Sequence, residues 1–263
     1  MQRSLCCICA VLIFMSGCTI LSVSQGRKDF NEAVALFSNS DCGKAVPRFA
    51  DAVQKEPGLR EAYVYMAECS LQKGDLKETL SLAKQGISVN AQHNKINGRL
   101  KIVLMDGGQR ALASHDNESA VLFFKEAVAL DQADSSLHIL LGKALLARGT
   151  KGDMKAALIE FKTALNKSSQ EAQNTELIRN VLFERAKEYS VKGDMYAASR
   201  CYLAYTENFN PNDVEACIAL GNIFSKTGNP VGALYYAQKA HAIDPKNKAA
   251  MELLNDLNGP IHP

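Results

Sequence analysis

The chain contains 263 residues, with 30 basic and 28 acidic side chains and a formal net charge of +2. A nearly neutral chain of mixed charge lacks the basic face that nucleic-acid binding needs, so we expect no nucleic-acid partner. The five histidines are scattered, with no second histidine or cysteine at metal-ligand spacing, so we expect no metal and no cofactor. No serine lies in a nucleophile-elbow pattern, which argues against an enzyme.

Residues 1–17 have the pattern of an export signal. Arg3 precedes an uncharged apolar run over residues 5–15, which is shorter than the roughly twenty residues of a membrane-spanning helix. The segment resembles a bacterial lipoprotein signal with its lipobox. That resemblance implies that Cys18 becomes the first residue of the mature protein and carries acyl chains, although Met15 stands where leucine is usual. An ordinary cleaved signal and an uncleaved anchor are the alternatives.

Residues 18–28 are predicted to form a short tether. At no more than ~3.5 Å per residue, this segment holds the following domain close to a membrane. Thr19 differs from the aspartate that retains enterobacterial lipoproteins in the inner membrane. The lipoprotein resemblance therefore implies the outer membrane, with the domain facing the periplasm.

A repeated spacing follows the tether: an alanine, an aromatic residue four positions later and a small residue three positions after that. Ala45, Phe49 and Ala52 set this spacing. It recurs at Ala120, Phe124 and Ala127, at Ala157, Phe161 and Ala164, at Ala198, Tyr202 and Tyr205, at Ala233, Ala237 and Ala240, and more weakly at Thr79, Ala83 and Gly86. Each set has helical periodicity and predicts one helix.

Turn signals separate these helices from a helix that precedes each of them. They occur at Gly74 with Asp75, at Gly193 with Asp194, and at Gly228 with Asn229. Glycine can adopt the left-handed conformation that ends a helix, and the Asp or Asn that follows can cap the next helix. The sequence therefore predicts a series of helix–turn–helix units.

These units resemble the tetratricopeptide repeat, which is about 34 residues long. The resemblance covers residues 29–245 and implies an all-α, right-handed α-solenoid of about six units, followed by a C-terminal cap helix and tail over residues 246–263. The units are predicted to begin near Gly26, Arg60, Lys101, Ser135, Arg179 and Val214.

Several positions depart from the repeat. Extra residues near 92–98 are expected to extend a helix or introduce a bend, and residues 150–152 form an insertion. Pro47 lies within a predicted helix and should strain it unless it falls near the start. Gly107 and Gly108 do not belong to a phosphate-binding motif and are interpreted as sites of close packing.

In this family a concave groove, lined by fixed positions of each first helix, binds a peptide or helix of a partner. The matching positions here are Val64, Glu68, Ile102, Met105, Gln109, Ile139, Lys143, Phe183, Lys187, Ile218 and Asn222. Contact between neighbouring helices is the alternative role for these residues. The lysine, asparagine and arginine set of the chaperone-binding subgroup is missing apart from Asn222, so that role is not expected.

Four cysteines remain beyond Cys18. Their positions in the repeat place Cys42 near Cys69, and Cys201 near Cys217, on adjacent helices. In an oxidising compartment each pair would join neighbouring repeats through a disulfide. The alternative is that all four are small buried thiols.

Together these features predict a lipid-anchored scaffold that binds another envelope protein. The architecture resembles pilotin-type lipoproteins that assist type IV pilus or secretion complexes, and also lipoproteins that dock cell-wall hydrolases. A lipid-anchored enzyme or ligand receptor is a third interpretation, disfavoured because the sequence shows no convergent polar site. Changing Phe183 and Ile218 to Asp is expected to abolish partner capture and leave the helix content intact.

Overall fold

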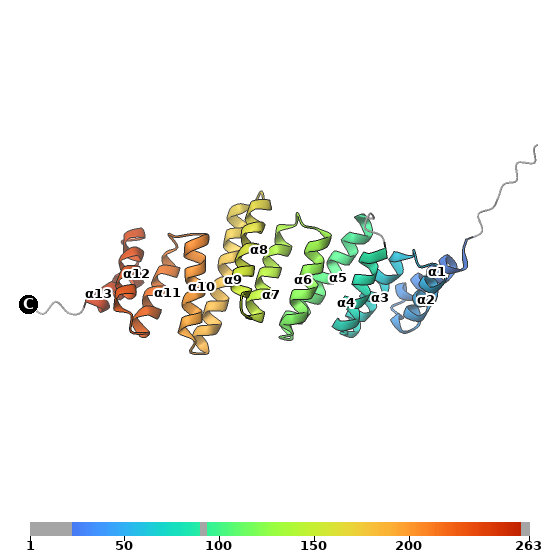
Figure 1. Ribbon diagram of the computed structural model, residues 1–263, viewed down its shortest axis with the longest axis horizontal. Helices are drawn as coiled ribbons and strands as arrows, with labels where there is room; N and C mark the ends of the chain where they lie inside the picture. The colour runs from blue at the N-terminus through green and yellow to red at the C-terminus, as the bar shows by residue number, and fades with distance from the viewer. Residues whose placement is uncertain (1–22, 90–93, 259–263) are drawn as a thin grey trace, which may run out of the picture.

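The computed structural model describes residues 23–89 and 94–258. Cys18 and the predicted export signal lie outside the described residues. Figure 1 shows the helices side by side along one long axis, with α1 near one end and α13 near the other. In chain order the helices are α1 (Gln25–Ser38), α2 (Cys42–Lys55), α3 (Arg60–Lys73), α4 (Leu76–Val89), α5 (Asn94–Ala113), α6 (Asn117–Leu130), α7 (Ser135–Arg148), α8 (Asp153–Lys167), α9 (Glu171–Val191), α10 (Met195–Asn208), α11 (Val214–Lys226), α12 (Pro230–Ile243) and α13 (Lys248–Asn258).

Consecutive helices pack as pairs, from α1 with α2 to α11 with α12. Each second helix also contacts the first helix of the next pair, which joins the pairs into a continuous array. At the C-terminal end, α13 packs against α11 and α12. Over the described part of the chain, this arrangement confirms the predicted α-solenoid of six helix pairs with a terminal helix.

The turns inside three pairs have the predicted geometry. Gly74, Gly193 and Gly228 have positive φ values of 80°, 79° and 74°. The residue after each glycine donates its backbone N–H to a carbonyl five positions earlier, and its side chain then accepts a backbone N–H of the next helix. This satisfies polar groups that both helix ends would otherwise leave unpaired.

Two further turns have the same geometry without glycine. Ser40 and His115 have φ values of 60° and 62°, and Asp41 and Asp116 cap the helices that follow. His115 and Asp116 thus form the turn between α5 and α6.

Close contact between the helices of a pair depends on small residues in the first helix. A Cβ atom on Gly142 of α7 would lie 2.3 Å from Cε1 of Phe161 in α8, and one on Gly108 of α5 would lie 2.6 Å from Cζ of Phe124 in α6. Both phenylalanine side chains are fully buried. Gly107 accommodates Phe123 in the same way, so the predicted close packing at these glycines is confirmed.

Two first helices begin earlier than the repeat spacing predicts. α5 begins at Asn94 rather than near Lys101, and α9 begins at Glu171 rather than near Arg179, which gives helices of 20 and 21 residues. The extra residues predicted before the third unit thus extend α5. The additional turns of α9 were not predicted, and they bury Ile178 in the core.

The amino-terminal boundary also differs from the prediction. The Ser24 hydroxyl accepts a hydrogen bond from the Arg27 backbone N–H, and this cap starts α1 at Gln25. Residues 25–28 are therefore helical instead of belonging to the tether. Pro47 lies in the second turn of α2, which continues past it to Lys55.

Only one of the two predicted disulfides is present in the described part of the chain. Cys42 of α2 and Cys69 of α3 are bonded, with their Cα atoms 5.6 Å apart. The prediction of a Cys201–Cys217 bond is wrong, because both are free and buried. Cys201 packs in the central core, whereas Cys217 packs with Ala240 in a separate C-terminal cluster. Burial raises the pKa of the Cys201 thiol to about 11, which keeps it protonated and unreactive.

Candidate peptide-binding surfaces

Six of the predicted groove residues are accessible on first helices, and we call them the first-helix surface. They are Ile102, Met105 and Gln109 of α5, Lys187 of α9, and Ile218 and Asn222 of α11. The three residues of α5 follow a spacing of i, i+3 and i+7, which places them on one side of the helix. Ile102 is 59% exposed, a large accessible fraction for an isoleucine side chain. This surface offers apolar area with single polar groups beside it.

Three of the predicted groove residues are buried instead, so the prediction was wrong for them. Val64 and Ile139 have 1% and 6% of their surface exposed and belong to the central core. Phe183 is 3% exposed, and its ring lies 4.9 Å from that of Tyr202. Because Phe183 fills space between α9 and α10, Phe183→Asp would place a charge in the core and unfold the domain. It cannot serve as a test of partner binding.

The remaining two predicted positions connect neighbouring first helices. Glu68 of α3 accepts two hydrogen bonds from the Arg99 guanidinium of α5, at 2.7 and 3.1 Å, and that guanidinium lies 4.1 Å from the ring centroid of Tyr65. Lys143 of α7 lies 3.4 Å from a carboxylate oxygen of Glu184 in α9. Each pair joins one predicted position to a residue of the next first helix that was not predicted to line the groove. The pairs bear out, for these two residues, the alternative role in helix–helix contact.

A shallow hollow of about 470 Å³ lies beside Lys187 at the C-terminal end of α9. Glu184, Glu188 and Val191 border it, and Val191 is 89% exposed. An apolar side chain of this exposure beside charged neighbours is a suitable contact for a partner. Sequence reasoning missed Val191 because the residue falls in the last turn of α9, beyond the groove positions of the repeat.

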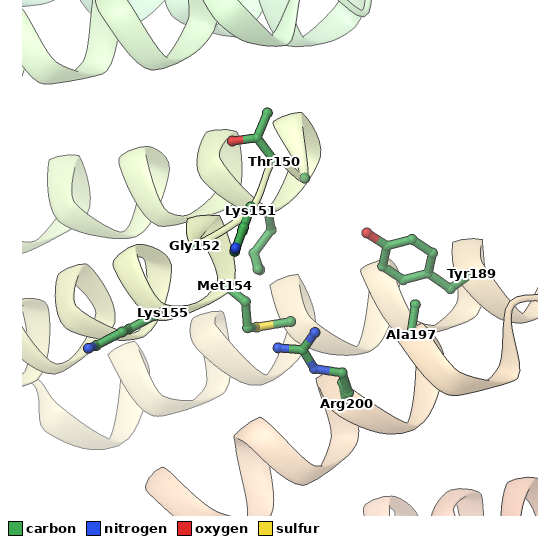
Figure 2. Close-up of a pocket in the computed structure, with 10 residues that line it drawn as sticks. Thr150, Lys151, Gly152, Met154, Lys155, Tyr189, Ala197 and Arg200 are labelled. Atoms are coloured by element: carbon green, nitrogen blue, oxygen red, sulfur yellow. The ribbon is translucent and has the colours of Figure 1, made fainter.

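A deeper cavity of about 350 Å³ lies where the α7–α8 turn faces α9 and α10 (Figure 2). Tyr189 of α9 and Met154 of α8 contribute its walls, and Lys151 and Arg200 line it from the turn and from α10. Figure 2 shows the Arg200 guanidinium directed toward Met154, the Tyr189 ring on another side, and Lys155 extending away from them. The cavity combines an apolar wall with positive charge.

Asp153 holds the turn that covers this cavity. Its carboxylate accepts hydrogen bonds from the Arg148 guanidinium at 2.7 and 3.0 Å, and from the Thr150 backbone N–H and hydroxyl at 2.8 and 2.7 Å. The Arg148 hydrogen bonds, together with those from Thr150, lower the pKa of Asp153 to about 2. The buried carboxylate thereby ties the end of α7 to the start of α8 and fixes the inserted residues 150–152.

Among the described residues, arginine side chains near the cavity form ion pairs with acidic residues, whereas two basic side chains that line the cavity do not. Arg148 pairs with Asp153 and Glu118, and Arg185 pairs with Glu188. In residues 23–89 and 94–258, Lys151 and Arg200 have no ion-pair partner. Sequence reasoning noted the insertion in the turn. The proximity of Arg200 to this turn could not be predicted from the sequence, because it depends on how α8 packs against the following helix pair.

The architecture assigns the fold. Six helix pairs follow one another, a left-handed turn residue joins the helices within each pair, and a small residue of one helix receives the aromatic residue of its partner in several pairs. The fold is a tetratricopeptide-repeat solenoid. No helix in the described residues is both long and apolar enough to cross a bilayer, and those residues contain no group of side chains arranged to hold a metal ion.

Comparison with known proteins returned structures only, since no family model and no curated protein matches the chain. YrrB, described as a tetratricopeptide-repeat protein with an unusual peptide-binding site, is 16% identical with a TM-score of 0.37, covering 85% of this chain and 89% of its own. PilW, a widely conserved type IV pilus biogenesis factor, is 17% identical with a TM-score of 0.35, covering 89% and 100%. MamA of Desulfovibrio magneticus RS-1 is 12% identical with a TM-score of 0.39, covering 86% and 98%. The fold assignment rests on the helix pairs themselves.

Proposed function

We propose that this protein is a lipid-anchored scaffold that binds another envelope protein through its first-helix surface. The observation that carries the proposal is the exposed side of α5, where Ile102, Met105 and Gln109 offer apolar area with an amide group. Buried apolar area supplies most of the affinity of protein interfaces, and polar groups beside it fix the register of the partner. An array of stacked repeats presents such residues over a long surface, which suits a helix or extended segment of a partner.

Site-specific photocrosslinking in intact cells tests the proposed surface. A photoreactive residue would replace Ile102 of α5 or, as a matched control, Ile159 of α8, which is 56% exposed but lies on a second helix. We expect a discrete adduct to one envelope protein from position 102 and none from position 159. Adducts from position 159 alone would place recognition on the opposite helices and overturn the proposal.

The identity of the crosslinked protein separates the two proposed roles. A secretin or another component of a pilus or secretion complex would support an assembly role, and a cell-wall hydrolase would support an adaptor role. Both roles use the same surface, so both predict that the adduct forms at position 102. Recovery of only cytoplasmic proteins would contradict the proposed compartment.

Attachment to the membrane through Cys18 is a separate part of the proposal. The lipobox resemblance supports it, and several acyl chains on one cysteine would hold the domain stably, whereas one chain binds only marginally. Changing Cys18 to Ser should move the protein from the membrane fraction to the soluble fraction. Retention of the Ser variant in the outer-membrane fraction would show that Cys18 does not anchor the chain.

A further inference from the structure

The cavity beside the α7–α8 turn adjoins a second cavity between α8 and α10. The second cavity, of about 210 Å³, shares Met154 and Arg200 with the first and is also lined by Leu158, Leu203 and Glu207. Met154 and Leu158 lie one turn apart on α8. Arg200, Leu203 and Glu207 follow a spacing of i, i+3 and i+7 on α10, so each helix turns one face toward the same space. We call these two adjoining cavities together the α8–α10 groove.

The α8–α10 groove is positively charged at one end and negatively charged at the other. Lys151 and Arg200 lie at the turn end, and Glu207 lies at the opposite end. Seven residues separate Arg200 from Glu207 on α10, which corresponds to ~10 Å along the helix axis. Glu207, like the two basic residues, has no ion-pair partner in the part of the chain that the structure describes.

Between the charged ends the α8–α10 groove is apolar. Met154 and Leu158 line it from α8, and Leu203 and Ala204 line it from α10. Leu158 and Leu203 are only partly buried, so they leave apolar surface in contact with water. A free phosphate or carboxylate would satisfy the basic end but would leave this apolar stretch uncovered. A chain with both charges and apolar side chains would cover all of it.

We propose that the α8–α10 groove is a second recognition site, which binds a short peptide segment of a partner. An acidic residue of that segment pairs with Arg200 and Lys151, apolar side chains lie against Met154 and Leu203, and a basic residue pairs with Glu207. Arg200 and Glu207 are ~10 Å apart along the axis of α10, a spacing that matches positions i and i+3 of an extended peptide or i and i+7 of a helix. This site is distinct from the first-helix surface and extends the proposed scaffold role.

Peptide selection tests the site without knowledge of the natural partner. A random dodecapeptide library displayed on phage would be panned on the purified full-length chain, and selected peptides would be measured by fluorescence anisotropy at low salt. We expect enrichment of peptides with Asp or Glu, apolar residues, and Lys or Arg at one of the two predicted spacings. The variant Arg200→Glu should bind these peptides at least tenfold more weakly than the wild type does. Selection that enriches no acidic, apolar peptides would overturn the proposal.

Lys162→Glu is the matched control for the charge reversal. Lys162 is exposed on α8 outside the groove lining, and circular dichroism would verify that both variants fold. The control should leave peptide affinity within about twofold of the wild type, and a peptide with Lys in place of its acidic residue should regain affinity for Arg200→Glu. Equal binding to wild type and Arg200→Glu would overturn the proposal.

The same peptides distinguish this site from the first-helix surface. Ile102 lies on α5, in the pair that precedes the two pairs forming the groove (Figure 1), so Ile102→Asp should bind the selected peptides as the wild type does. Peptides whose binding is weakened by Ile102→Asp but not by Arg200→Glu would bind at the first-helix surface. That result would support the proposed function and refute the second site.

Discussion

His115 occupies the turn position that glycine takes in three other helix pairs. Its φ of 62° is left-handed, a conformation that is unfavourable for residues with a Cβ atom, and its side chain is exposed. We expect His115→Gly to raise the free energy of unfolding by about 0.5–1 kcal/mol. Urea denaturation would measure the change. Gly193→His, at a φ of 79°, is the reverse substitution and should lower the free energy of unfolding by a similar amount. A loss of stability in His115→Gly would show that the left-handed conformation is not unfavourable for His115.

Asp153 should make the stability of the fold depend on pH in the acid range. Its pKa in the folded protein is about 2, against an ordinary value of 3.8, mainly because Arg148 hydrogen-bonds to the carboxylate. A lowered pKa stabilises the folded state above pH ~4, and this contribution is lost as the pH falls toward 2. We expect Asp153→Asn to lower the free energy of unfolding by about 2 kcal/mol at pH 7.

Urea denaturation at several pH values would check this expectation for Asp153. The difference between wild type and Asp153→Asn should shrink as the pH falls from about 4 to about 2, because the wild-type carboxylate becomes protonated over that range. Asp51→Asn, a change of an exposed carboxylate on α2, should have little effect at any pH. A difference that stayed constant with pH would show that the charge of Asp153 does not stabilise the turn.

At the scale of helices, the Cys42–Cys69 disulfide joins the second helix of the first pair to the first helix of the next. The bond closes a loop with a sequence separation of 27 residues, and such a loop stabilises the fold by about 3 kcal/mol through the unfolded state. Reduction should therefore lower the stability of the wild type by that amount and leave a Cys42→Ala, Cys69→Ala double variant unchanged. An equal response of both proteins to reductant would contradict this role.

The helix pairs could be predicted from sequence because local signals specify them. The glycine turns at Gly74, Gly193 and Gly228 and the alanine–aromatic spacing each act within a few residues. The exposure of single positions could not be predicted as well. Phe183 and Ile218 occupy corresponding places in their repeats, yet Phe183 packs against Tyr202 and is buried while Ile218 is partly exposed. Such differences depend on how neighbouring pairs stack, as does the convergence of Lys151 and Arg200.

At the scale of the whole molecule, the solenoid separates attachment from recognition. Figure 1 shows α1 and α13 toward opposite ends of the array, so the proposed attachment at Cys18 would hold the α1 end near a membrane. The first-helix surface then extends from α5 to α11, with Ile102 and Asn222 in different repeats. The α8–α10 groove lies between them along the chain. On the proposed function, a partner segment would contact several repeats at once, and the array would set how far those contacts lie from the proposed anchor.

Binding of the crosslinked partner to two matched variants tests whether the first-helix surface carries recognition. Ile102 and Ile159 have similar exposure, 59% and 56%, but lie on a first and a second helix, so Ile102→Asp and Ile159→Asp make the same change on different surfaces. We expect Ile102→Asp to weaken binding of the partner at least tenfold in a titration with the purified proteins, whereas Ile159→Asp should bind like the wild type. Unchanged binding by Ile102→Asp, or a loss confined to Ile159→Asp, would contradict this expectation.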